Sequence, residues 1–85
     1  MDSIAKTVIT ELLEATPDFV EACQSDDSYS AVNVEQYIGV NRLEDKLLAA
    51  GYKFPMNPEE YGSDSFFNFN DAIMFDLVTD LIFEV

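Results

Sequence analysis

Residues 71–85 read DAIMFDLVTDLIFEV, and the secondary structure of this stretch decides the fold class of the 85-residue chain. On a helical wheel one broad face is apolar, and it is formed by Met74, Phe75, Leu77, Val78, Leu81, Ile82 and Val85. Asp76, Asp80 and Glu84 line the opposite side, with Ile73 and Phe83 beside them. The same three acids also share one face of a strand, and Phe, Ile and Val favour strands. The length of the stretch favours a helix.

Helical patterns before this stretch predict a mainly α protein, a compact bundle of four to five short helices with a Pro/Gly-containing loop before the C-terminal helix. The alternative is an α+β fold in which residues 52–85 form a small sheet. Ser3 is a candidate N-cap for a first helix that ends near Ala15. Its buried face is expected to contain Ile4, Ala5, Val8, Ile9, Leu12 and Leu13. Thr16 and Pro17 are typical of the N-cap and first residue of a second helix, over 17–24, or of a kink.

The central segment contains two patterns typical of capping boxes. The first, Asn33 with Gln36, predicts a helix that ends at Gly39. The second, Asn41 with Glu44, predicts a helix that ends before Gly51. The apolar residues expected on this second helix are Leu43, Leu47, Leu48 and Ala50. Residues 53–65 are predicted to form a loop because they contain two prolines and a glycine. The aromatic residues expected to pack from there into the core are Tyr52, Phe54 and Tyr61. One domain, residues 1–85, is expected.

Charge is the strongest functional signal in the sequence. Seventeen Asp and Glu face four Lys and Arg, with no His, and the formal net charge is −13. Seven acids and no base lie between Thr7 and Asn41, and seven more acids without a base lie between Phe54 and Val85. Free nucleic acid and anionic membranes are disfavoured as partners, because both are bound through Lys and Arg. The composition therefore predicts a positively charged protein partner.

Two rows of acids lack the cations that usually accompany them on a helix. If residues 3–24 formed one continuous helix, a single stripe would carry Glu11, Glu14, Asp18 and Glu21. Asp76, Asp80 and Glu84 form the second row. Exposed helices commonly place Lys four residues after Glu, since each pair adds a few tenths of a kcal/mol. Asp80 and Glu84 also lie in the last turn, where the helix dipole disfavours negative charge.

Catalytic and metal-binding chemistry finds little support in the sequence. Without His and with a single cysteine, the chain lacks the ligands of a usual zinc site and the base of a histidine-assisted nucleophile. Cys23 is expected to be a small core residue. An EF-hand loop starting at Asp26 would have Ala31 where Gly is required and Tyr37 where Glu is required. We therefore expect no enzyme activity and no cofactor. The lone cysteine and the short apolar runs favour a soluble cytoplasmic protein.

Two short segments resemble known families. Gly62-Ser63-Asp64-Ser65-Phe66 resembles the attachment site of acyl and peptidyl carrier proteins, which implies phosphopantetheine on Ser65, although the family needs two helices beyond it and only twenty residues follow. Residues 34–52 resemble a helix-turn-helix, which implies DNA binding through the second helix. Glu35 and Asp45 depart from that pattern, since the family prefers a small and an apolar residue there.

The acid rows favour a non-enzymatic inhibitor that mimics nucleic acid and blocks the basic DNA- or RNA-binding channel of a larger protein. Phage anti-restriction and anti-CRISPR proteins are of this class and share charge and size with this chain. Expected partner-binding residues are Asp76, Asp80, Glu84, Ile73, Phe83, Glu11, Glu14, Asp18, Glu21, Asp26 and Asp27, with Tyr29 as a further apolar anchor. An acidic immunity protein or adaptor for a basic partner is the alternative, and a monomer and a homodimer both remain open.

Overall fold

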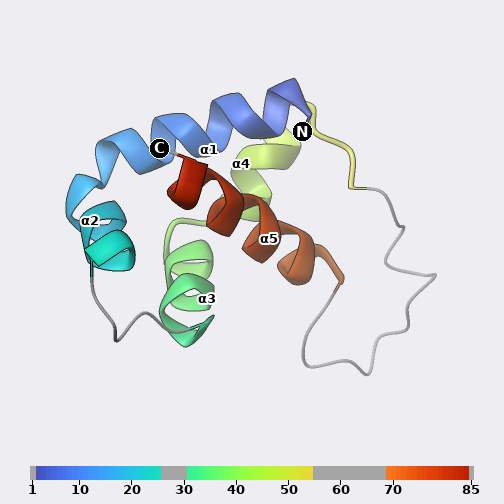
Figure 1. Ribbon diagram of the computed structural model, residues 1–85. Coiled ribbons are helices and arrows are strands. Elements are labelled where there is room, and N and C mark those ends of the chain that lie inside the picture. Colours follow the sequence, from blue (N-terminus) through green and yellow to red (C-terminus); the bar gives the residue numbers. More distant parts are fainter. Residues whose placement is uncertain (1, 26–30, 55–68, 85) are drawn as a thin grey trace.

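The computed structural model describes residues 2–25, 31–54 and 69–84, and these parts of the chain contain five α-helices and no strand (Figure 1). The helices are α1 (Ser3–Ala15), α2 (Pro17–Ser25), α3 (Ala31–Val40), α4 (Leu43–Ala49) and α5 (Phe69–Glu84). The prediction of a mainly α bundle is confirmed. Helix α5 occupies nearly all of the stretch that decides the fold class, so the strand interpretation of that stretch is wrong.

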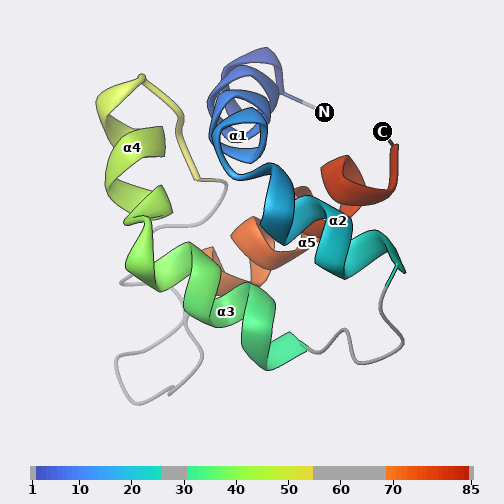
Figure 2. The ribbon, with the colours of Figure 1, turned by 90° about the vertical axis from the view of Figure 1, so that its left-hand side faces the viewer.

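Helix α5 is the central element of the bundle. It packs against each of the other four helices, with α1 on one side of it and α3 on the other (Figure 2). Met74, Val78, Leu81 and Ile82 are buried, and Phe75 and Leu77 pack against the core at its edge. The predicted apolar face is therefore confirmed for every member except Val85, which lies outside the described residues. Packing on several sides explains why α5 is apolar over most of its circumference.

Helix α1 begins with a different cap from the one predicted. Asp2, rather than Ser3, is the N-cap: its Oδ1 accepts hydrogen bonds from the backbone N–H groups of Ile4 at 2.8 Å and Ala5 at 3.2 Å. A carboxylate is favoured here by the helix dipole as well as by these bonds. The predicted face divides into two rows. Ala5, Ile9 and Leu13 are fully buried, whereas Ile4 is 37% exposed and Val8 and Leu12 lie at the edge.

The chain breaks between α1 and α2 at Thr16, as the Thr-Pro pattern predicts. Its backbone has φ −129° and ψ 60°, which is not helical, because a following proline disfavours the α region. The Thr16 carbonyl accepts the Val20 N–H at 3.3 Å, but its hydroxyl contacts the Leu12 carbonyl and the Tyr37 hydroxyl, at 3.0 and 2.7 Å, and does not cap α2. Phe19 stacks on the Tyr37 ring with the centroids 3.9 Å apart, which joins α2 to α3.

Helices α3 and α4 form the predicted central pair, but neither capping box is present. Helix α3 starts at Ala31, two residues before Asn33, and includes Gly39. The Asn41 side chain closes α3 by donating to the Tyr37 carbonyl at 2.9 Å, and the left-handed residue Arg42 (φ 51°) starts α4 without a side-chain cap. Such a short connection leaves Asn41 within the end of α3, so it cannot also cap α4.

Glu44, the second partner in the predicted box, instead connects α4 to α5. Its carboxylate accepts a hydrogen bond of 2.8 Å from the side-chain amide of Asn70, which is 5% exposed. A buried amide needs such a partner, because leaving it unpaired costs about 1–3 kcal/mol. The Asn70–Glu44 bond therefore fixes the start of α5 against α4.

The end of α4 agrees with the glycine prediction. Gly51 has φ +96°, and the N–H groups of Gly51 and Tyr52 bond the carbonyls of Leu48 at 3.1 Å and Leu47 at 2.9 Å. This is the Schellman arrangement, in which a glycine adopts the conformation that other residues avoid. Leu43 and Leu47 are fully buried, whereas Leu48 is 53% exposed and Ala50, the C-cap, is exposed.

Aromatic residues after α4 extend the core, as predicted. Tyr52 and Phe54 pack against it and meet edge to face, with ring centroids 4.9 Å apart. Tyr61 and the other predicted loop residues after Phe54 lie outside the described residues. Cys23 is buried, and burial raises the pKa of its thiol. This burial confirms the prediction of a core cysteine.

Candidate partner-binding surface

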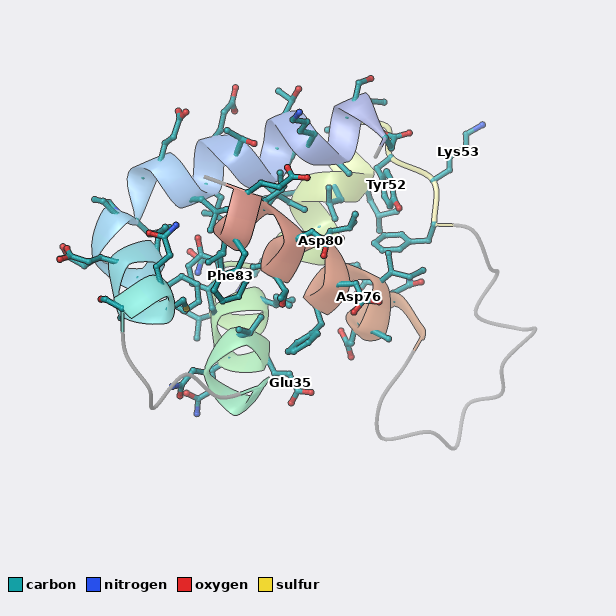
Figure 3. All side chains as sticks on the ribbon, viewed as in Figure 1. Glu35, Tyr52, Lys53, Asp76, Asp80 and Phe83 are labelled. Carbon is teal, nitrogen blue, oxygen red and sulfur yellow. The ribbon has the colours of Figure 1, made fainter. Side chains whose placement is uncertain are left out.

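The solvent-facing side of α5 is a narrow acidic strip. Among residues 70–84, the exposed ones are Asp76, Asp80, Phe83 and Glu84, and we call these four the α5 acidic face. Phe83 is 55% exposed, an unusual exposure for a large aromatic side chain on a helix that is otherwise packed. Figure 3 shows Asp76, Asp80 and Phe83 along the outer side of α5. The predicted second row of acids is thus on the surface, with an exposed aromatic residue beside it.

Helical geometry sets the spacing of these carboxylates. Asp76, Asp80 and Glu84 are four residues apart, which corresponds to an axial rise of about 6 Å per step. Two nucleotides of one DNA strand rise about 6.8 Å. This comparison requires that the three acids lie on a helix, and α5 is a helix from Phe69 to Glu84.

Cations are absent from the sequences of three helices. Helices α2, α3 and α5 contain no Lys or Arg. Lys6 lies on α1 and Arg42 lies in the α3–α4 connection. Lys46 lies on α4, and Lys53 follows that helix. Lys46 donates to the Asn41 carbonyl, and Figure 3 shows Lys53 extending away from α5. The repulsion within the α5 acidic face is therefore not relieved by a cation on its own helix or on α2 or α3.

The first predicted acid row is exposed but is not a single stripe. Glu11 and Glu14 lie on α1, and Asp18 and Glu21 lie on α2. All four are exposed, yet the break at Thr16 invalidates the continuous wheel on which the stripe was drawn. The structure instead brings Glu14 and Glu21 to one pocket, between α1, α2 and the end of α5.

The remaining predicted contact residues have mixed outcomes. Ile73 is half-buried and therefore less exposed than predicted; its role as a partner contact stays a prediction. Asp26, Asp27 and Tyr29 lie outside the described residues, as does Ser65, the carrier-type serine.

Sequences and structures of known proteins give no further guidance. No protein-family model, curated protein or solved structure matches this chain.

The described residues also bear on three other kinds of site: a metal site, a membrane-spanning helix and a helix-turn-helix. No group of three acids or cysteines within 2–25, 31–54 and 69–84 is placed to hold a metal ion. In the same ranges, no helix has the length and apolar character needed to cross a membrane. The α3–α4 pair has the compact connection of a helix-turn-helix, but Glu35 and Asp45 are both exposed and α4 has only seven residues. Its packing is explained by Val34, Ile38, Leu43 and Leu47.

One contact near the acids had no signal in the sequence. Gln24, at the end of α2, donates a 2.7 Å hydrogen bond through Nε2 to the Ile82 carbonyl. That carbonyl is among the last four of α5, which lack partners within the helix. Residues 58 positions apart are joined here, and no periodicity or motif relates them.

Proposed function

We propose that this protein is a non-enzymatic inhibitor that mimics nucleic acid and occupies the basic binding channel of a larger protein in the cytoplasm. The observation that carries the proposal is the α5 acidic face. The central helix of the bundle exposes three carboxylates at helical spacing and one aromatic side chain, with no cation on that helix.

The cost of this arrangement supports a role in binding. Glu84, in the last turn of α5, opposes the helix dipole, at roughly 0.3–1 kcal/mol. An Asp or Glu followed four residues later by Lys would instead stabilise the helix by about 0.2–0.5 kcal/mol per pair. A domain of this size has only about 4–13 kcal/mol of stability. Carboxylates that oppose folding become favourable when a cationic surface covers them.

The aromatic residue gives the surface more than charge. Binding energy in protein interfaces is concentrated in a few residues, with aromatic side chains and Arg enriched among them. Phe83 lies between Asp80 and Glu84 in sequence and is more than half exposed. We assign it the role of an apolar anchor, with the carboxylates supplying orientation and association rate.

Stability is expected to rise with salt, because screening relieves repulsion among the acids. The screening length falls from about 30 Å at 0.01 M to about 3 Å at 1 M salt. A gain of about 1 kcal/mol would raise the Tm by about 4–8 °C. Thermal unfolding followed by circular dichroism between about 20 mM and about 500 mM NaCl measures this. The D76N/D80N variant should show a smaller rise; a Tm that does not change with salt contradicts the repulsion argument.

Capture and competition test the function directly. The immobilised protein is incubated with bacterial lysate, and the bound proteins are challenged with duplex DNA or with polyglutamate of equal total charge. We expect nucleic-acid-binding proteins to be captured, and DNA to release them at concentrations at which polyglutamate does not. Capture that DNA leaves unchanged would overturn mimicry and favour the acidic adaptor or immunity protein.

A further inference from the structure

The pocket at the junction of α1, α2 and α5 combines an apolar floor with an acidic rim. Its volume is about 250 Å³, and its apolar lining comes from Leu13, Pro17, Val20 and Leu81. A cavity of about 150 Å³ is enough to admit benzene. The pocket therefore has room for one large side chain from another molecule.

Two acidic residues from different helices are among those that line the pocket. Glu14 stands on α1 and Glu21 on α2, and both are exposed. Thr10 and Gln24 complete the polar part of the lining. Gln24 is held in place by its hydrogen bond to the Ile82 carbonyl, which fixes the α2 wall of the pocket against α5.

Helix ends add to the negative potential. Leu13 and Glu14 lie in the last turn of α1, and Leu81 lies in the last turn of α5. The carbonyl end of a helix is equivalent to about half a negative charge. Hydrogen bonds from Thr16 to the Leu12 and Leu13 carbonyls and from Gln24 to the Ile82 carbonyl reduce this charge without removing it. Neither last turn contains a basic residue. Residues from both ends of α2, Pro17 and Gln24, line the pocket. The positive and negative ends of that helix therefore have opposing effects on the potential in the pocket.

We propose that this pocket receives an arginine side chain of the basic partner. An arginine can lay its apolar stem along Leu13, Val20 and Leu81 while its charged head stays at the rim. The guanidinium is more weakly hydrated than an ammonium group and donates in a planar fork, which suits two carboxylates at the edge of an apolar site better than lysine does. Charge repulsion at −13 disfavours a second copy of this chain as the occupant.

The inference rests on the proposed function, because it takes the partner to be a basic protein. It adds a contact that is separate in place from the α5 acidic face and that nucleic-acid mimicry alone does not require. A row of carboxylates imitates phosphates, whereas an apolar pocket selects one side chain.

A methyl NMR titration with N-acetyl-arginine amide tests the pocket. We expect saturable shifts at the methyl groups of Leu13, Val20 and Leu81, weaker shifts with the lysine derivative, and none with the uncharged citrulline derivative. In the E14Q/E21Q variant the affinity should fall roughly fivefold to tenfold. The control D2N/D45N, which removes the same charge from exposed acids outside the pocket, should bind as the wild type does.

A second variant separates the apolar floor from the charge. V20F fills the pocket without changing any charge, and it should also abolish the methyl shifts at Leu13 and Leu81. Shifts spread over the surface acids without saturation, or equal affinity in E14Q/E21Q and D2N/D45N, would overturn the inference. That outcome leaves the capture experiment intact, and capture that resists DNA would overturn mimicry without affecting the arginine titration.

Discussion

The L47A variant is expected to lose about 2–5 kcal/mol of unfolding free energy. Leu47 is fully buried on α4, the helix that contacts α1, α3 and α5. The substitution removes its transfer free energy and leaves a cavity that the surrounding helices fill only in part. A loss of this size takes a large share of the roughly 4–13 kcal/mol available to a domain of 85 residues.

Leu48 provides a matched control for that variant. It is the next residue on the same helix and is 53% exposed, so L48A should change the unfolding free energy by less than about 0.5 kcal/mol. Urea unfolding followed by circular dichroism measures both variants. Equal losses of unfolding free energy in L47A and L48A would mean that α4 does not bury Leu47 in preference to Leu48.

The D76N/D80N variant is expected to weaken binding to the captured partner by up to about 30-fold. Each exposed ion pair is worth up to about 1 kcal/mol, and every 1.4 kcal/mol corresponds to a factor of about ten in affinity. Both residues are exposed on α5, and asparagine keeps the shape of aspartate. The free variant should also be at least as stable as the wild type at low salt, because it loses repulsion.

Distance distinguishes a direct contact from a general charge effect. The D2N/D45N control also removes two charges, from residues outside the α5 acidic face; asparagine still caps α1 at position 2. At physiological ionic strength, charges more than about 8 Å away are largely screened. The control should therefore lose little affinity by calorimetry against the purified partner. Equal losses in the two variants would mean that net charge, rather than the α5 acidic face, determines binding.

Periodicity and composition were sufficient for the helices themselves. The Thr-Pro junction, the glycine at the end of α4 and the amphipathic pattern of α1 are local features, and local sterics and backbone hydrogen bonding determine them. The caps were predicted less well. Asp2 caps α1 where Ser3 was expected, and Asn41, which was expected to cap α4, closes α3 instead. Several polar residues near a helix end can accept or donate, and the surrounding packing selects among them.

The sequence by itself determined the helical bundle, the core row of α1, the buried face of α5 and the excess of acid on both flanks. Only the tertiary structure decided which acids share a surface. The break at Thr16 divides the first acid row between two helices, and the contact of α2 with the end of α5 brings Glu14 and Glu21 to one apolar pocket. Helical periodicity predicts only which residues of one helix share a face. The relative position of two helices depends on side-chain packing between distant segments, which no local pattern contains.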